Sequence, residues 1–184
     1  MQVAIIGAGP LGRWLAFAAA RAGYTVLLED VMPANLHHAQ EYLRQQSGPE
    51  ALPKVMFVST IEAAVREADL VIDCVPDELE SKLEIFCLLD RMAPPRTVLM
   101  TPTMRLSIAD LASCTYRAEK CVALVANARE FTRGMMTNSQ DRINGTDILL
   151  RTPPRVTLDT IALVRQFWES VGFMPRFEVD TAPL

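Results

Sequence analysis

Residues 3–12 read VAIIGAGPLG, and this stretch decides the fold class. Val3 to Ile6 form a short, continuous apolar run, which is typical of a strand buried on both faces of a parallel sheet. A glycine-rich turn of the GxGxxG type follows, and the turn leads into a run rich in Ala and Leu that predicts a helix. Strand, tight turn and helix in this order predict the first unit of a Rossmann-type fold.

Each glycine of the turn has its own expected role. Gly7 makes the tight turn, Gly9 lets a pyrophosphate approach the backbone, and Gly12 lets the helix pack close to the strand. Pro10 sits near the first helical position, where a missing N–H group costs nothing. The free N–H groups and the positive end of the helix dipole would face the phosphates. The turn therefore predicts a dinucleotide site, and a glycine-rich turn without a ligand is the alternative.

An acidic residue follows the second expected strand, which covers residues 25–29. Asp30 lies close to the usual offset of about 20 residues from the turn, and its carboxylate can accept both ribose hydroxyls of an adenosine. A 2′-phosphate would be repelled there, and the neighbouring Glu29 adds to that repulsion. No arginine follows in residues 31–33. The sequence thus favours NAD over NADP, although Asp30 could instead cap the next helix or stabilise a turn.

The remainder of the chain continues the alternation of strands and helices. Strands are expected at 25–29, 55–58, 70–75, 98–100, 122–126, 148–150 and 173–179, and helices at 11–22, 33–46, 60–67, 78–92, 107–112 and 158–171. This alternation predicts one α/β domain over residues 1–184, a Rossmann-type, doubly wound, mostly parallel sheet of about eight strands flanked by helices. Residues 127–147 lack periodicity and predict an irregular loop or arm, of the kind that serves as a lid or an interface.

Composition excludes several classes of function. The 184 residues carry a net charge of −4 without a cluster of basic residues, which argues against a nucleic-acid partner. No apolar run approaches the roughly 20 residues of a membrane span, and no signal peptide is expected. The cysteines lack metal-ligand spacing, so we expect free thiols, no metal site and a cytoplasmic location. They are Cys74, Cys87, Cys114 and Cys121.

Three segments resemble the 3-hydroxyacyl-CoA dehydrogenases: VAIIGAGPLGRWLAFAAARAGYTVLLEDV, ADLVIDCVPDELESKLEIFCLLDRMAPPRTVL and RLSIADLA. The resemblance runs from residue 3 to about 125 and resumes over residues 148–179. It implies NAD as the cofactor, with an acidic residue after the fourth strand and a lysine five positions later near the nicotinamide, here Asp77 and Lys82. The alternative is that both are solvated residues at a helix start. The candidate cofactor-binding residues are Gly7, Gly9, Pro10, Leu11, Gly12, Asp30, Val75, Asp77, Lys82 and Thr103.

The same resemblance breaks at the substrate side. The family uses a histidine base at the end of the sixth strand and a glutamate that orients it. Val125 stands at the histidine position here, and Ile148 stands at the glutamate position if the later strand is aligned through residues 151–153. Met104 replaces a serine that would bind the substrate, whereas Thr103 remains. Residues 46–54 are too few for the helical arm that helps hold CoA in the family. The chain also ends about where the family's dimerising helical domain would begin.

Other groups that could move a proton are His37, His38, Tyr116, Lys120, Glu130, Arg133 and Asp141. The two histidines are expected on a solvated helix face on the adenosine side of the fold, far from the nicotinamide. Tyr116 and Lys120 share a helix face only if their segment is helical, and the neighbouring Arg117 indicates surface. Nothing in the sequence places the last three, from the loop, over the cleft.

Two functions remain open. One is an NAD-dependent oxidoreductase of this family with an altered small-molecule or acyl substrate and an unidentified base. The other is a non-catalytic NAD(H)-binding or redox-sensing module that acts with a partner. A homodimer is also expected, because large apolar patches on monomers are uncommon. The candidate apolar residues for its surface are Met135, Met136, Trp168 and Phe173.

Overall fold

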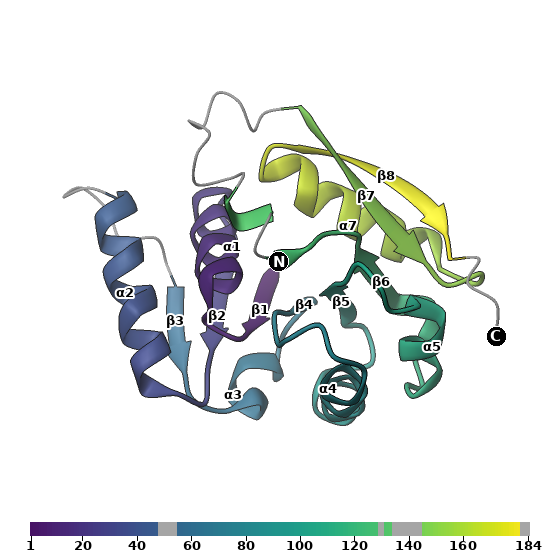
Figure 1. Cartoon of the computed structure of the whole chain (residues 1–184), viewed down its shortest axis with the longest axis horizontal. Coiled ribbons are helices and arrows are strands. Elements are labelled where there is room, and N and C mark those ends of the chain that lie inside the picture. Colours follow the sequence, from purple (N-terminus) through teal and green to yellow (C-terminus); the bar gives the residue numbers. More distant parts are fainter. Residues whose placement is uncertain (48–54, 129–130, 134–144, 181–184) are drawn as a thin grey trace.

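The computed structural model describes residues 1–47, 55–128, 131–133 and 145–180. An eight-stranded sheet runs through these residues in the order β3-β2-β1-β4-β5-β6-β7-β8 (Figure 1). The strands are β1 (Gln2–Ile6), β2 (Thr25–Glu29), β3 (Val55–Val58), β4 (Leu70–Asp73), β5 (Val98–Pro102), β6 (Cys121–Leu124), β7 (Thr146–Thr152) and β8 (Phe173–Val179). The helices are α1 (Pro10–Arg21), α2 (Pro33–Ser47), α3 (Ile61–Val65), α4 (Leu79–Met92), α5 (Ile108–Ser113) and α7 (Leu158–Ser170), with a short 3₁₀ turn at Ala118–Lys120.

The sheet is parallel from β3 to β6, because every strand pair in this part has a parallel register. The chain winds from β1 outward through β2 and β3, and then returns to place β4 on the other side of β1. The connections that leave β1 and β4 therefore turn in opposite directions. A crevice opens at the carboxyl ends of these two strands, which is where open α/β sheets bind ligands.

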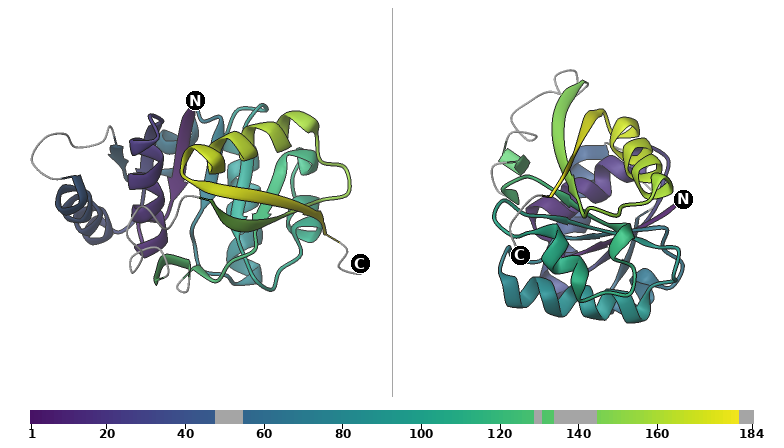
Figure 2. Two further views of the ribbon diagram at one scale, coloured as in Figure 1. Left: turned by 90° about the horizontal axis from the view of Figure 1, so that it is seen from above. Right: turned by 90° about the vertical axis from the view of Figure 1, so that its right-hand side faces the viewer.

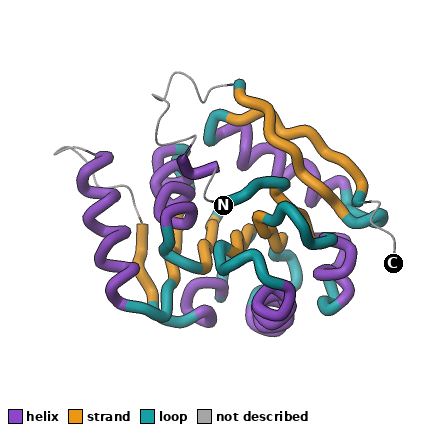
Figure 3. The backbone as a smooth tube through the Cα atoms, in the orientation of Figure 1, coloured by secondary structure: helices purple, strands orange, loops and turns teal. Residues whose placement is uncertain are grey.

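Helices cover both faces of the sheet (Figures 1 and 3). Buried side chains of α1, α2 and α7 form one core with one face of the strands, and those of α3, α4 and α5 form a second core with the other face. The apolar runs of the strands are buried because both faces are covered. The predicted Rossmann-type, mostly parallel sheet of about eight strands is thereby confirmed.

The last two strands differ from the rest in direction. β7 pairs antiparallel with β6, and β8 pairs parallel with β7 along seven residue pairs. The two strands form a long ribbon beside α7 (Figure 2). β7 begins at Thr146, so the expected irregular stretch 127–147 overlaps a strand at its end. Of the residues expected there, Glu130, Met135, Met136 and Asp141 lie outside the described residues.

An aromatic cluster joins α1, α7 and β8. The Phe131 ring lies 5.7 Å from that of Trp14 and 5.6 Å from that of Phe173, and the Trp168 ring lies 5.4 Å from that of Phe173. Trp168 and Phe173 are 0% and 1% exposed, so the prediction that they form a dimer surface is wrong. They are buried because α7 and β8 pack their apolar faces onto α1 and the sheet.

Of the two neighbouring residues Tyr116 and Arg117, which precede β6, only Arg117 departs from expectation. Tyr116 is fully exposed, as expected for a surface residue, but Arg117 is only 7% exposed. Its Nε donates to Oδ1 of Asp90 at 2.7 Å, and its terminal nitrogens donate to backbone carbonyls at the end of α4. Arg117 thus anchors this loop to α4 and is not the surface group that its charge suggested.

Two further expectations can be compared with the structure. His37 and His38 are exposed on α2, as predicted, and His37 faces Glu41 at 3.3 Å. Among the described helices, none combines the length and the apolar character that crossing a membrane would require.

Candidate functional site

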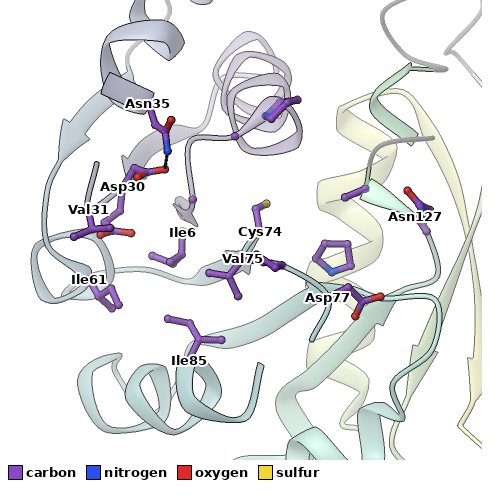
Figure 4. A pocket seen from close by; sticks show the side chains of 18 residues that line it. Ile6, Asp30, Val31, Asn35, Ile61, Cys74, Val75, Asp77, Ile85 and Asn127 are labelled. Atoms are coloured by element: carbon purple, nitrogen blue, oxygen red, sulfur yellow. Dashed lines mark hydrogen bonds between the residues drawn. The ribbon is translucent and has the colours of Figure 1, made fainter. Parts of the chain in front are cut away.

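A cleft of about 740 Å³ opens at the carboxyl ends of the central strands, within the size range of small-molecule sites. It runs from the carboxyl end of β2 and the first turn of α2, past the glycine turn, to the loops after β4, β5 and β6 (Figure 4). The described residues that line it are Ile6, Gly7, Gly9, Pro10, Glu29, Asp30, Val31, Asn35, Ile61, Cys74, Val75, Pro76, Asp77, Ile85, Pro102, Ala126, Asn127 and Ala128.

The glycine turn forms the middle of the cleft, and its geometry explains the spacing. Gly7 has φ +99°, a conformation that side chains disfavour, and a Cβ there would lie 3.3 Å from the Cys74 backbone. A Cβ on Gly12 would lie 1.8 Å from the carbonyl oxygen of Gly7, so α1 can approach the turn only with glycine at this position. The predicted conformational roles of Gly7 and Gly12 are therefore confirmed.

Gly9 differs from the other two glycines because a Cβ there would meet no atom within 4 Å. Its φ of −64° is open to any residue, so neither packing nor backbone conformation requires glycine. Gly9 faces the cleft beside Pro10, the first residue of α1. Open space at a helix N-terminus suits a phosphate group.

Asp30 lies at one end of the cleft, 8% exposed, and the backbone around it is organised by its carboxylate. Oδ2 accepts hydrogen bonds from the Ala8 N–H at 2.8 Å and from Nδ2 of Asn35 at 3.0 Å (Figure 4). Oδ1 accepts from the Met32 N–H at 2.8 Å. Asp30 therefore ties the glycine turn to the start of α2, which is the turn role predicted as the alternative to binding a ribose.

Glu29 lies beside Asp30 and is 5% exposed. Burial, with a contribution from the negative charge of Asp30, raises the pKa of Glu29 to about 7. Its carboxyl group thus titrates near neutral pH, whereas an ordinary glutamate is ionised well below it.

Apolar side chains form the walls at this end. Val31, which is 77% exposed, approaches the cleft from the loop after β2, and Ile61 approaches it from the first residue of α3 (Figure 4). Ile6 and Ile85 lie on the inner side. Two apolar walls next to a carboxylate suit a flat, uncharged ring attached to a sugar, which is the chemistry of an adenosine.

The other end of the cleft is formed by loops after β4, β5 and β6. Val75 and Asp77 come from the first of these loops; Val75 was expected in the strand before it, but β4 ends at Asp73. Oδ2 of Asp77 accepts from the Met104 N–H at 3.2 Å. This bond connects the loop after β4 to the loop after β5. Cys74 lines the same wall, and burial raises the pKa of its thiol to about 12, so the thiol stays protonated at neutral pH.

Lys82 does not line the cleft. Its side chain is 0% exposed, and Nζ donates to Oδ2 of Asp73 at 2.9 Å and to the Val75 carbonyl at 3.0 Å. Asp73 also accepts from Thr101 at 2.9 Å and from the Val75 N–H at 2.8 Å. The predicted solvated position at a helix start is wrong, because α4 carries the Lys82 ammonium under the loop after β4, where it holds the carbonyl of the cleft residue Val75.

Two other candidates also lie away from the cleft. Leu11 is 4% exposed and packs in the core against the sheet. The Thr103 hydroxyl accepts from the N–H groups of Arg105 and Leu106 at 3.3 and 3.0 Å, so it shapes the turn before α5. Neither of these two side chains lines the cleft.

Val125 directly follows β6 and Ile148 lies in β7, and these are the two positions at which the resemblance predicted a histidine and a glutamate. The Val125 N–H donates to the Leu149 carbonyl at 2.9 Å, and Ile148, which precedes Leu149, is 7% exposed in the core. The cleft is lined by Ala126, Asn127 and Ala128, directly after Val125. Tyr116 and Lys120 lie elsewhere, with the Lys120 ammonium on the Pro95 carbonyl at 2.7 Å.

Several lining residues were not predicted from the sequence. Apolar and small residues such as Val31, Ile61 and Pro102 have no sequence pattern that marks a binding site. Only the folded chain brings them together. Asn35 could have been found, since an amide in the first turn after an acidic residue often hydrogen-bonds it. No cluster of three or more histidine, cysteine or acidic residues suited to a metal ion occurs in the described parts of the chain.

Comparisons with known proteins agree with this geometry. Residues 2–125 match the family described as 3-hydroxyacyl-CoA dehydrogenase, NAD binding domain. The chain is 28% identical over 163 residues to a probable 3-hydroxybutyryl-CoA dehydrogenase of Bacillus subtilis, covering 78% of this chain and 56% of that protein. It is 30% identical over 141 residues to the mitochondrial hydroxyacyl-coenzyme A dehydrogenase of Sus scrofa, covering 67% and 45%.

Solved structures show the same fold. A 3-hydroxybutyryl-CoA dehydrogenase from Escherichia coli superposes with a TM-score of 0.80 at 24% identity, covering 98% of this chain and 38% of that one. A diketoreductase superposes with a TM-score of 0.79 at 24% identity, covering 97% and 64%. The chain spans about half the length of the curated relatives that it matches.

Proposed function

Because the chain belongs to the 3-hydroxyacyl-CoA dehydrogenase family through its NAD-binding domain, we propose that it binds NAD(H) along the described cleft. The bound NAD(H) takes part in an oxidoreductase reaction. The adenosine lies between Val31 and Ile61 with its ribose at Asp30. The pyrophosphate lies at Gly9 and Pro10, and the nicotinamide lies toward Val75 and Asp77. When bound, NAD supplies the hydride acceptor.

The observation that carries this proposal is the open space at Gly9. Gly7 and Gly12 are required by the fold itself, whereas a Cβ at Gly9 would meet nothing within 4 Å. A glycine without a packing or conformational reason, at the N-terminus of α1 and facing the cleft, is best explained by a group that comes close to the backbone. A pyrophosphate is such a group.

The test is a titration of the purified protein with NADH and with NADPH, followed by calorimetry or by the fluorescence of the reduced nicotinamide. Binding of NADH that is tighter than that of NADPH is expected, because Glu29 and Asp30 lie at the ribose end. Absence of NADH binding at millimolar concentration would contradict the proposal.

A non-catalytic NAD(H)-binding module is the second candidate, and one observation favours it. By the resemblance, Val125 stands where the family carries its histidine base, and Ile148 stands where it carries the glutamate when the later strand is aligned through residues 151–153. Neither can take a proton, and the loss of a general base typically costs 10²–10⁴-fold in rate. An assay of NADH oxidation with acetoacetyl-CoA separates the candidates, since turnover at ordinary dehydrogenase rates excludes the non-catalytic one.

We also propose an acyl substrate, a cytoplasmic location and a homodimer. An acyl substrate is supported by the names of the relatives, and a cytoplasmic location by the free cysteines among the described residues. A homodimer needs another surface than Trp168 and Phe173. The outer strand β8 exposes Met174 and Val179 by 54% and 53%, and light scattering at micromolar concentrations would test the dimer.

A further inference from the structure

The carboxylate of Asp30 has little acceptor capacity left for a ligand. A carboxylate has about four lone-pair sites. Two of those on Oδ2 are taken by the Ala8 N–H and the Asn35 amide, and one on Oδ1 is taken by the Met32 N–H. One site on Oδ1 remains. A ribose presents two adjacent hydroxyl groups, and each needs an acceptor of its own, so Asp30 can serve one of them while keeping its own contacts.

The carboxylate of Glu29 is in the opposite situation. It lines the same cleft and is 5% exposed. Within the described residues, no hydrogen bond or ion pair reaches it. Its neighbours along the cleft wall include the apolar side chains of Ile6 and Ile61. A buried carboxylate without hydrogen-bond donors costs free energy when it is ionised, so such a group in a cleft is a candidate for contact with a ligand.

We propose that Glu29 accepts the second hydroxyl of the adenosine ribose and is the main residue by which this cleft rejects a 2′-phosphate. This inference rests on the proposed position of NAD(H) in the cleft. Glu29 and Asp30 then share the ribose, with one acceptor from each. Asp30 mainly holds the glycine turn and the start of α2, whereas the carboxylate of Glu29 discriminates between a ribose hydroxyl and a 2′-phosphate.

The proximity of the two carboxylates supports the assignment to the ribose. The charge of Asp30 acts on Glu29 strongly enough to contribute to its raised pKa. Two acceptors on consecutive residues that both line the cleft offer one partner to each of the two neighbouring ribose hydroxyl groups. A phosphate on the 2′ position would instead place two or nearly two negative charges against both carboxylates, without an arginine in residues 31–33 to balance them.

The experiment compares Glu29→Gln and Glu29→Ala with the unaltered protein, using NADH and NADPH as ligands. A hydrogen bond to a charged group contributes roughly 1.5–3 kcal/mol, so NADH affinity should fall about tenfold to a hundredfold in Glu29→Ala. NADPH affinity should stay constant or rise in both variants. Glu62→Gln, an exposed glutamate on α3, is the matched control and should change neither affinity.

Three outcomes would overturn the inference. Equal losses for NADH and NADPH would indicate a packing role for Glu29, and unchanged NADH affinity would exclude any contact. A loss that disappears with nicotinamide hypoxanthine dinucleotide, which lacks the adenine amino group, would assign the carboxylate to the base instead of the ribose. Failure of the unaltered protein to bind NADH would contradict the proposed function itself, and is distinguishable because it needs no variant.

Discussion

Lys82 Nζ lies 2.9 Å from Oδ2 of Asp73, and both side chains are 0% exposed beneath the wall of the cleft. The ammonium also holds the Val75 carbonyl, and the carboxylate holds the Val75 N–H. The pair therefore fixes both polar groups of one residue in the loop after β4. Burial raises the pKa of Asp73 above its usual value, and the charge of Lys82 opposes that shift.

Lys82→Met is expected to destabilise the protein by about 3–5 kcal/mol, because it leaves the Asp73 carboxylate buried without its counter-charge. Urea unfolding followed by circular dichroism measures this. The double variant Asp73→Asn/Lys82→Met removes both charges and keeps an acceptor for the Val75 N–H. It should recover more than half of the lost free energy. A double variant as unstable as the single one would contradict the ion-pair explanation.

Gly9→Ala and Gly12→Ala should separate ligand binding from folding. A Cβ at Gly12 would lie 1.8 Å from the Gly7 carbonyl oxygen, so α1 must move and the protein should lose at least about 1–3 kcal/mol of stability. A Cβ at Gly9 meets nothing within 4 Å, so Gly9→Ala should unfold at the same urea concentration as the unaltered protein.

NADH affinity should change in Gly9→Ala, although the stability of this variant should not. Gly9→Ala should weaken NADH binding by tenfold or more on the premise that a pyrophosphate oxygen approaches this backbone, an effect of at least about 1.4 kcal/mol. Calorimetric titration measures this. Unchanged NADH affinity in a folded Gly9→Ala protein would place the pyrophosphate elsewhere.

Arg117→Met is expected to cost about 3–5 kcal/mol of unfolding free energy, because Asp90 would stay buried at 5% side-chain exposure without its partner. Arg96→Met is the control. Its pair with Asp69 has comparable geometry, at 3.1 Å, but 61% of the Arg96 side chain is exposed. Exposed pairs contribute at most about 1 kcal/mol. Equal effects of the two variants in urea unfolding would refute the distinction.

These examples also show which features could be predicted from the sequence. The glycine turn and the alternation of strands and helices depend on neighbours in the chain, and local patterns therefore predicted them. The positions of Lys82 and Arg117 depend on how α4 packs against the loops after β4 and α5. Charged residues are mostly exposed, so a local reading placed both on the surface or in the cleft.

The candidate site divides in the same way. Asp30 was predicted because it follows β2 at a known offset from the turn. The three hydrogen bonds that its carboxylate accepts were not predictable, because one donor, the Ala8 N–H, comes from another strand–helix connection. Trp168 and Phe173 were misplaced for a related reason: their burial depends on Phe131 and Trp14, which approach from distant parts of the chain.

The last prediction concerns pH and follows from the raised pKa of Glu29. The pKa moves from 4.5 in the unfolded chain to about 7 in the folded protein, so the folded state holds this proton more tightly. The stabilisation from that proton is fully present below pH 4.5 and is lost as the pH rises through about 7. The unfolding free energy of the unaltered protein, relative to Glu29→Gln, should therefore fall between these two values and stay level above them.

Binding should show the opposite slope. A ribose hydroxyl that donates to Glu29 stabilises its ionised form, so NADH binding should release a proton and grow tighter from pH 6 to pH 8. Asp30 is the charged group that contributes to the shift of Glu29, and it stays in place in Glu29→Gln. The variant should bind NADH with the same affinity at both pH values. Calorimetry in two buffers of different ionisation enthalpy measures the proton release, and a pH-independent affinity in the unaltered protein would contradict the contact.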